Sequence, residues 1–134
     1  MSIEYYIEGF LHESHKGIDI NRVIHCFQPT IEEAEDSFYT LNYDELNSCE
    51  MSLSIEQGEV TSICIHNPCD HERLDQDIIQ LLRVGPYVLF APDGNALIVG
   101  SEEIRKSVPA DMVEELGQPI VVEAGAVFSK LLFG

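Results

Sequence analysis

Two hydrophobic periodicities alternate along this chain, and together they predict a fold that mixes strands with helices. The segment Ile3–Leu11 alternates apolar with acidic or tyrosine side chains, which is typical of a half-buried strand. In the segment Asp70–Arg83, by contrast, leucine and isoleucine recur at the i, i+4, i+7 and i+8 positions of one helix face. Asp70 is a suitable N-cap for this helix, and Gly85 with Pro86 ends it.

Apolar runs bounded by turn residues predict further strands. These are expected at Arg22–Phe27, Ser48–Glu56, Glu59–His66, Tyr87–Ala91, Ala96–Val99 and Pro119–Glu123. Gln57 and Gly58 join the second and third of these strands in a hairpin. We prefer a three-residue loop, in which Gly58 supplies a positive φ and Met51 faces Ile63, to a two-residue loop that would place Met51 opposite Cys64. Residues 92–95, Pro-Asp-Gly-Asn, form the turn of a later hairpin.

An acidic amphipathic helix is predicted after Pro29. Thr30 and Glu33 match a capping box, and apolar residues then fall at helical spacing as far as Leu41, with acidic residues on the other side. Acidic residues in a first turn also suit the helix dipole. Later helices are expected to open at Ser101, to restart at Pro109 and close at Gly117, and to span Ala126–Leu132.

This order of elements predicts the fold class. Hairpins placed between helices favour a mostly antiparallel sheet, with about three to four helices packed against it. The chain has 134 residues, which is a usual length for one domain with one core, and it contains no linker or repeat. We therefore expect a single α+β domain over residues 1–134.

Charge narrows the possible partners. The chain carries 24 Asp and Glu against 7 Lys and Arg, a formal net charge of −17, and 13 of the acids lie in residues 1–60 with only two bases. A compact acidic protein repels nucleic acid and anionic membranes and attracts basic surfaces. We expect a basic protein as partner, and neither nucleic acid nor membrane.

One stretch of the first half carries acids with no base among them, and tyrosines lie between the acids. Ordinary surfaces intersperse both signs of charge, so this stretch is the predicted partner site, although a charged helix face is often only solvated. Tyrosines anchor interfaces well, but these could equally cap the core of the sheet. The predicted partner-binding residues are Glu32, Glu33, Glu35, Asp36, Tyr39, Tyr43, Asp44 and Glu45.

The sequence contains no clear motif for a metal site or for catalysis. Cys64, His66, Cys69 and His71 could converge on zinc, but their spacing matches no recognised zinc finger, so we expect no metal and no cofactor. Cys69 precedes a predicted helix N-terminus, yet no general base can be assigned to it, and no phosphate-binding glycine motif is present. We expect no enzyme. The N-terminus lacks the pattern of an export signal, and a cytoplasmic location is expected.

The chain resembles small bacterial immunity proteins, which neutralise the toxin domains of polymorphic or contact-dependent toxin systems. The likeness is one of kind, a short acidic α+β domain without a catalytic motif. The second half of the chain, from Ile63 through residues 81–94 and then residues 108–122, also resembles that of small immunity-like proteins. The resemblance implies a 1:1 complex in which an acidic face fills the groove of a basic nuclease. An acidic secretion chaperone, or a nucleic-acid mimic that inhibits a DNA-binding protein, is the alternative.

Overall fold

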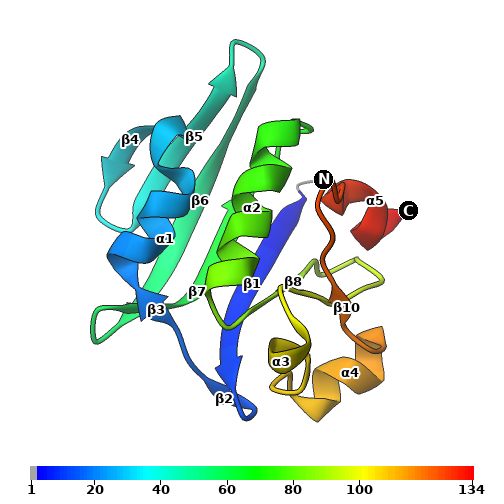
Figure 1. Ribbon diagram of the computed structural model, residues 1–134. Helices are drawn as coiled ribbons and strands as arrows, with labels where there is room; N and C mark the ends of the chain where they lie inside the picture. The colour runs from blue at the N-terminus through cyan, green and yellow to red at the C-terminus, as the bar shows by residue number, and fades with distance from the viewer. Residues whose placement is uncertain (1–2) are drawn as a thin grey trace.

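One sheet of ten strands organises residues 3–134, the part of the chain that the computed structural model describes (Figure 1). The strands are β1 (Glu4–Leu11), β2 (Ser14–His15), β3 (Ile18–Asp19), β4 (Ile31–Glu35), β5 (Phe38–Asp44), β6 (Asn47–Glu56), β7 (Glu59–His66), β8 (Tyr87–Phe90), β9 (Ile98–Val99) and β10 (Ile120–Val121). The helices are α1 (Ile20–Phe27), the 3₁₀ turn η1 (Gln28–Thr30), α2 (Glu72–Val84), α3 (Glu102–Arg105), α4 (Ala110–Leu116) and α5 (Phe128–Phe133).

The topology confirms the predicted α+β class. The strands follow the order β10-β9-β8-β1-β7-β6-β5-β4, with β2 paired to β1 and β3 paired to β7. Neighbouring strands are antiparallel except β9 and β10, which are parallel. The described chain has five α-helices where three to four were expected. None of the helices in residues 3–134 has the length and apolar character needed to span a membrane.

The main core lies between the sheet and the helices α1, α2 and α5, which pack on one of its faces (Figure 1). Alternate residues of the long strands point into it and are fully or almost fully buried. These include Ile7 of β1, Met51 of β6 and Ile63 of β7, against Phe27 of α1 and Leu81 of α2. Burial of such apolar area is the main force that holds the helices to the sheet.

A second, smaller core lies on the opposite face, at the β8–β9 end of the sheet. Val88 and Val99 point away from the main core there, and the helices α3 and α4 cover them together with Phe10. The helices α3 and α4 pack only at this end. Within residues 3–134, no helix therefore covers the opposite face of β7, β6, β5 and β4, where the side chains are half-buried or exposed.

The segment Arg22–Phe27, predicted as a strand, is part of helix α1, so that prediction is wrong. Asp19 is its N-cap, with a side chain that accepts a hydrogen bond from the Asn21 amide at 2.8 Å. Val23, Cys26 and Phe27 are the buried residues of the helix, at i, i+3 and i+4 spacing.

The acidic helix predicted from Thr30 to Leu41 is also wrong, because residues 31–44 form the hairpin β4–β5. Asp36, with φ of 54°, turns the chain between the two strands. Thr30 is no helix cap: its hydroxyl donates to the Phe27 carbonyl oxygen at 2.8 Å. From Tyr39 to the end of β5, every second residue is buried, which is the pattern of a strand with one face in the core.

The β6–β7 hairpin is confirmed, but the preferred three-residue loop is wrong: the loop has two residues, and neither of the partners considered for Met51 is right. Glu56 pairs with Glu59 across a two-residue turn in which Gln57 and Gly58 both have positive φ, at 52° and 81°. A shift between Ser54 and Ile55 then inserts one extra residue in β7, so that Met51 faces Ile65. The positive φ expected at Gly58 is present.

The elements after residue 66 largely confirm the predictions. Helix α2 starts one residue later than expected because the side chain of His71, not Asp70, caps it. Helix α3 is capped by Ser101, helix α4 ends at Gly117, and β8 pairs with β9 as a hairpin.

Candidate functional site

The candidate site is the face of β1, β7, β6, β5 and β4 that turns away from α1 and α2, named here the open face. Its side chains are half-buried or exposed. Most of their neighbours along β1, β5, β6 and β7 are buried in the main core, whereas the edge strand β4 has no fully buried residue. The open face comprises Glu4, Tyr6 and Glu8 of β1, Ser62, Cys64 and His66 of β7, Glu50, Ser52 and Ser54 of β6, Phe38, Thr40 and Asn42 of β5, and Glu33 and Glu35 of β4.

Strand register arranges these side chains in rows. Residues that face each other across paired strands share a side of the sheet. One row crosses five strands in the order Glu4, His66, Glu50, Thr40 and Glu33. Three carboxylates therefore lie along a single line, with one histidine as the only group in the row that could carry positive charge.

The adjacent row is aromatic. It runs from Phe90 of β8 through Tyr6, Cys64 and Ser52 to Phe38 and ends at Glu35. Phe38 is 42 % exposed, which is unusual for a phenylalanine in a strand. Tyr6 and Phe90 are half-buried, and their rings lie 5.8 Å apart. The open face thus has aromatic surface beside a row of acids.

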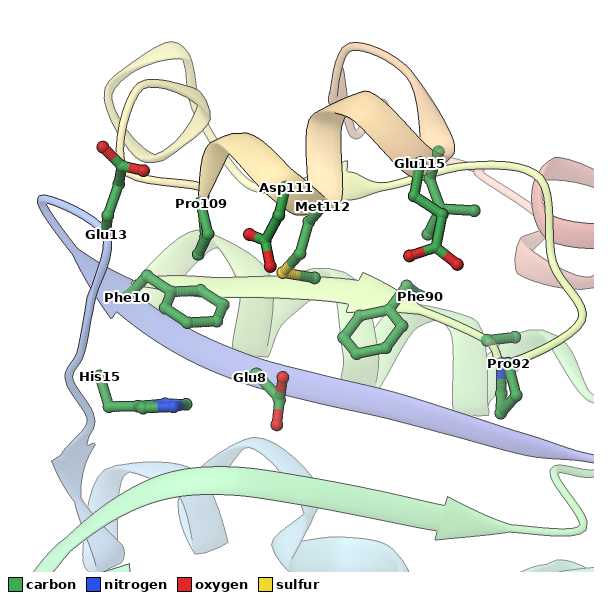
Figure 2. Close-up of a pocket in the computed structure, with 12 residues that line it drawn as sticks. Glu8, Phe10, Glu13, His15, Phe90, Pro92, Pro109, Asp111, Met112 and Glu115 are labelled. Atoms are coloured by element: carbon green, nitrogen blue, oxygen red, sulfur yellow. The ribbon is translucent and has the colours of Figure 1, made fainter.

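A groove of about 560 Å³ continues the open face toward helix α4. Phe10 and Phe90 of the sheet face Met112 of α4, and Asp111 and Glu115 project from α4 toward the sheet (Figure 2). The lining includes four carboxylates and no Lys or Arg; the acids are Glu8, Glu13, Asp111 and Glu115. The groove therefore combines aromatic and methionine surface with carboxylates from both the sheet and α4.

Glu13 also fixes one wall of this groove. Its Oε1 accepts a hydrogen bond from the Ala110 amide, at 3.1 Å, where helix α4 begins. The Glu13 amide in turn donates to the Ser107 carbonyl oxygen at 3.1 Å. These contacts tie the β1–β2 turn to the start of α4 and keep the carboxylates of the groove in place.

Positive charge is kept away from the open face. None of the ten strands contains a Lys or Arg. Two of the bases are already paired, Lys16 with Glu59 and Arg105 with Glu102, each at 3.0 Å. The seven bases lie in the β2–β3 connection (Lys16), in α1 (Arg22), in α2 (Arg73 and Arg83), in or after α3 (Arg105 and Lys106) and in α5 (Lys130).

The structure places the predicted acids Glu32, Glu33, Glu35 and Asp36 on the edge hairpin, and all are exposed. Glu33 and Glu35 belong to the open face by register, and Glu32 Oε2 accepts a hydrogen bond from Asn42 Nδ2 at 3.0 Å. These carboxylates therefore share a surface, although on a strand and not on the expected helix.

Tyr39 and Tyr43 are absent from this surface. Both are only 8 % exposed and belong to the main core, which is the role that the sequence left open beside partner binding. The Tyr43 hydroxyl donates to Asp77 Oδ2 at 2.9 Å, and the Thr30 hydroxyl approaches the same oxygen at 3.4 Å. Burial raises the pKa of Asp77 and of Tyr43. The expectation that the two tyrosines anchor a partner is thus corrected.

Asp44 and Glu45 lie at the end of β5 that is remote from Asp36. Asp44 accepts from the Leu46 amide at 2.8 Å and from Asn47 Nδ2 at 2.9 Å, and hydrogen bonding from Asn47 lowers its pKa. Asp44 Oδ2 also lies 3.4 Å from His71 Nε2. These contacts give Asp44 a structural role in the β5–β6 turn, away from the row of acids.

The cysteine and histidine cluster is divided between two places. Cys64 and His66 lie on the open face, with Sγ and Nδ1 3.7 Å apart. His71 instead caps α2, where its Nδ1 accepts from the Arg73 amide at 3.0 Å. Burial raises the pKa of the Cys69 thiol, which is opposite to the low pKa that a nucleophilic cysteine at a helix N-terminus needs.

Sequence reasoning missed most of the open face. Glu4, Glu8 and Glu50 were not among the predicted partner residues, nor were Asp111 and Glu115 of the groove. The period-two pattern of residues 3–11 already placed Glu4 and Glu8 on one side of a strand. What it could not supply was the neighbouring strands, because β1 pairs with β7 and β8, far along the chain.

Comparison with protein-family models, with curated proteins and with solved structures gave no match for this chain. The function is therefore inferred from the geometry and charge of the open face and the groove.

Proposed function

We propose that this protein is an immunity protein: it binds a basic toxin domain of the nuclease kind through the open face and the adjoining groove, and blocks the active site of that toxin. The observation that carries the proposal is a sheet face without a covering helix that bears one row of three carboxylates and further acids beside it, in a sheet whose strands contain no Lys or Arg. The opposite sheet face is a closed core.

The arrangement of charge and aromatic surface suits a protein partner. Interfaces are commonly held by central aromatic anchors with a polar rim around them. On the open face, Tyr6, Phe38 and Phe90 share one row, with the row of Glu4 and Glu50 on one side. A partner with Lys and Arg around an apolar centre would match this pattern.

A nuclease is the class of toxin that fits best, because its substrate groove must bind phosphate with cationic side chains. Carboxylates held on a rigid sheet can occupy those cations in place of the phosphates. Electrostatic complementarity of this kind raises the association rate and selects the partner. It also offsets the mutual repulsion of the acids, which in the free protein lowers stability.

The test is a charge reversal on the open face. The triple variant Glu33→Lys, Glu35→Lys, Glu50→Lys changes exposed residues only, so the fold should be retained. Binding to the cognate toxin domain should weaken by several kcal/mol if these residues contact its cations. Isothermal titration calorimetry gives the affinity, and survival of cells that co-express the toxin gives the protection.

The matched control carries the same change of charge elsewhere. Glu103, Glu114 and Glu123 are exposed and lie on or beside α3, α4 and β10, outside the open face and the groove lining. Their joint replacement by Lys should leave binding almost unchanged. Equal loss of affinity in the two variants would show a general charge effect, and full affinity in the first would exclude the open face as the interface.

A further inference from the structure

Three side chains with metal-binding atoms converge at the centre of the open face. Glu4 lies on β1 directly opposite His66 of β7, and Cys64 lies two residues before His66 on the same side of the strand. One ligand atom from each of Glu4, Cys64 and His66 lies within 4.8 Å of the other two. All three side chains are half-buried.

The spacing of sulfur and nitrogen fits one metal ion. Cys64 Sγ and His66 Nδ1 are 3.7 Å apart. Zinc binds thiolate sulfur at about 2.3 Å and imidazole nitrogen at about 2.0–2.1 Å, so a tetrahedral angle separates the two ligands by about 3.6 Å. The pair can therefore share an ion with little movement of either side chain.

Surrounding side chains orient these ligands. His66 Nε2 and Ser52 Oγ are hydrogen bonded at 3.0 Å, and the ring of Phe38 stacks on the imidazole at 6.1 Å between centroids. With the proton on Nε2 donated to Ser52, the Nδ1 lone pair is directed to the side where Cys64 lies. The Tyr6 hydroxyl donates to Glu4 Oε2 at 2.9 Å. Such support is typical of ligands around a metal.

We propose that Cys64 Sγ, His66 Nδ1 and a Glu4 carboxylate oxygen form a zinc-binding site, with a fourth position open to water. Thiolate and imidazole select zinc over magnesium or calcium, which prefer oxygen ligands only. On binding, the Cys64 thiol releases its proton to solvent and its sulfur bonds to the ion. Glu50, the other neighbour of His66 in its row, adds negative charge near the ion.

The other two members of the sequence cluster take no part in this site. His71 uses Nδ1 to cap α2, and its Nε2 faces Asp44. Cys69 lies beside Cys49, and neither belongs to the three-ligand group. The structure thus replaces the set considered from the sequence with Cys64, His66 and a ligand from β1 that the sequence did not indicate.

The test uses the isolated protein and zinc or cobalt ions alone, in a thiol-free reductant, so it does not depend on the proposed partner. Zinc titration against a chromophoric chelator should show one equivalent bound. Cobalt should give the sulfur-to-metal charge-transfer absorption and the intense visible bands of a tetrahedral thiolate site. Absence of stoichiometric binding, or a cobalt spectrum without the sulfur band, would overturn the proposal even if every variant failed to fold.

Variants then identify the ligands. Cys64→Ser and His66→Ala should each weaken zinc binding by about 100-fold or more, and Ser52→Ala, which alters a positioning residue, by about tenfold. The controls Cys69→Ser and His71→Asn should bind as the wild type does, and asparagine can still cap α2. Equal loss in Cys69→Ser and Cys64→Ser would contradict this ligand set.

Discussion

At the scale of single residues, two carboxylates of α2 show how the acidic composition reaches into the core. Asp77 accepts hydrogen bonds from Tyr43 and Thr30 and so links the helix to β5 and to the η1 turn. Asp75 has no such pair of hydroxyl donors, and burial raises its pKa to about 6, with Asp70 and Glu72 adding to the effect. Burial raises the pKa of both carboxyls, so ionisation of each costs stability, and the hydroxyl donors at Asp77 offset part of that cost.

Replacement of Tyr43 by phenylalanine should destabilise the protein. The change removes the hydroxyl that donates to Asp77 Oδ2 at 2.9 Å and leaves that carboxylate with the more distant Thr30. We expect the free energy of unfolding to fall by about 1–2 kcal/mol, as measured by urea denaturation. Tyr39→Phe is the matched control, because Tyr39 lies on the same strand and face but its hydroxyl makes no bond to Asp77. Equal losses in both variants would contradict this role of the Tyr43 hydroxyl.

Asp75→Asn should stabilise the protein above pH 6. The folded state raises the pKa of this carboxyl to about 6, above its unfolded value of about 3.9, so ionisation of Asp75 costs stability once the pH rises through 6. Asparagine keeps an acceptor for the Phe128 amide and removes the charge. We expect a gain of about 1–2 kcal/mol at pH 7.5 that shrinks as the pH falls toward 4.

Unfolding in urea at several pH values measures this gain. Asp93→Asn, at the exposed β8–β9 turn, serves as the control and should show no such pH-dependent difference. A gain that stayed constant from pH 4 to pH 7.5 would rule out ionisation of Asp75 as its origin.

At the scale of elements, the β6–β7 turn shows how backbone geometry limits the choice of residue. Gly58 has a φ of 81°, and a Cβ placed there would meet no atom within 4 Å. Gly58→Ala should therefore lower the free energy of unfolding by about 1–2 kcal/mol through backbone strain alone. Gly58→Asn should cost clearly less, because asparagine tolerates positive φ. Thermal unfolding of both variants tests this, and equal losses would point to a cause other than the turn geometry.

Elements with one dominant local signal were predictable from the sequence, and elements with two competing signals were not. Helix α2 has a long apolar stripe, and β1 alternates from Glu4 to Glu8, so both were found. In residues 30–41, good helix formers such as Glu32 and Glu33 outweighed the alternation that begins at Tyr39. In α1, Asp19 was not recognised as a helix N-cap, so the segment with Val23, Cys26 and Phe27 at helical spacing was predicted as a strand.

The candidate site was predictable only in part, for a related reason. The acids of β4 were identified from their charge, which needs no fold. Glu50 and Glu4 lie beside them only because of the register of five paired strands. That register could not be derived from the sequence, because residues 22–27 were predicted as a strand and residues 30–41 as a helix. Tyr39 and Tyr43 changed from surface to core once residues 38–44 became a strand with one buried face.

At the scale of the whole molecule, the fold separates charge by face. The helices α1, α2 and α5, which cover the main core, carry four of the seven bases, and the strands carry none. Cross-strand carboxylates such as those flanking His66 repel each other, and repulsion of this kind lowers stability. The cost is lowest when a cationic surface covers the open face, so the same feature that weakens the free protein favours its complex.

The kinetics of that complex should divide between the two kinds of row on the open face. Charged residues act at long range, so raising the salt concentration from about 0.05 M to about 0.5 M should slow association with the toxin domain by about tenfold or more and leave dissociation nearly unchanged. The Glu33→Lys, Glu35→Lys, Glu50→Lys variant should associate slowly at low salt and lose most of that salt dependence.

Phe38→Ala removes an aromatic contact that acts only after docking, and it should speed dissociation while association stays the same. Stopped-flow or surface plasmon resonance separates the two rates. An association rate that does not change with salt concentration would show that the acids of the open face do not accelerate association, whatever the final affinity.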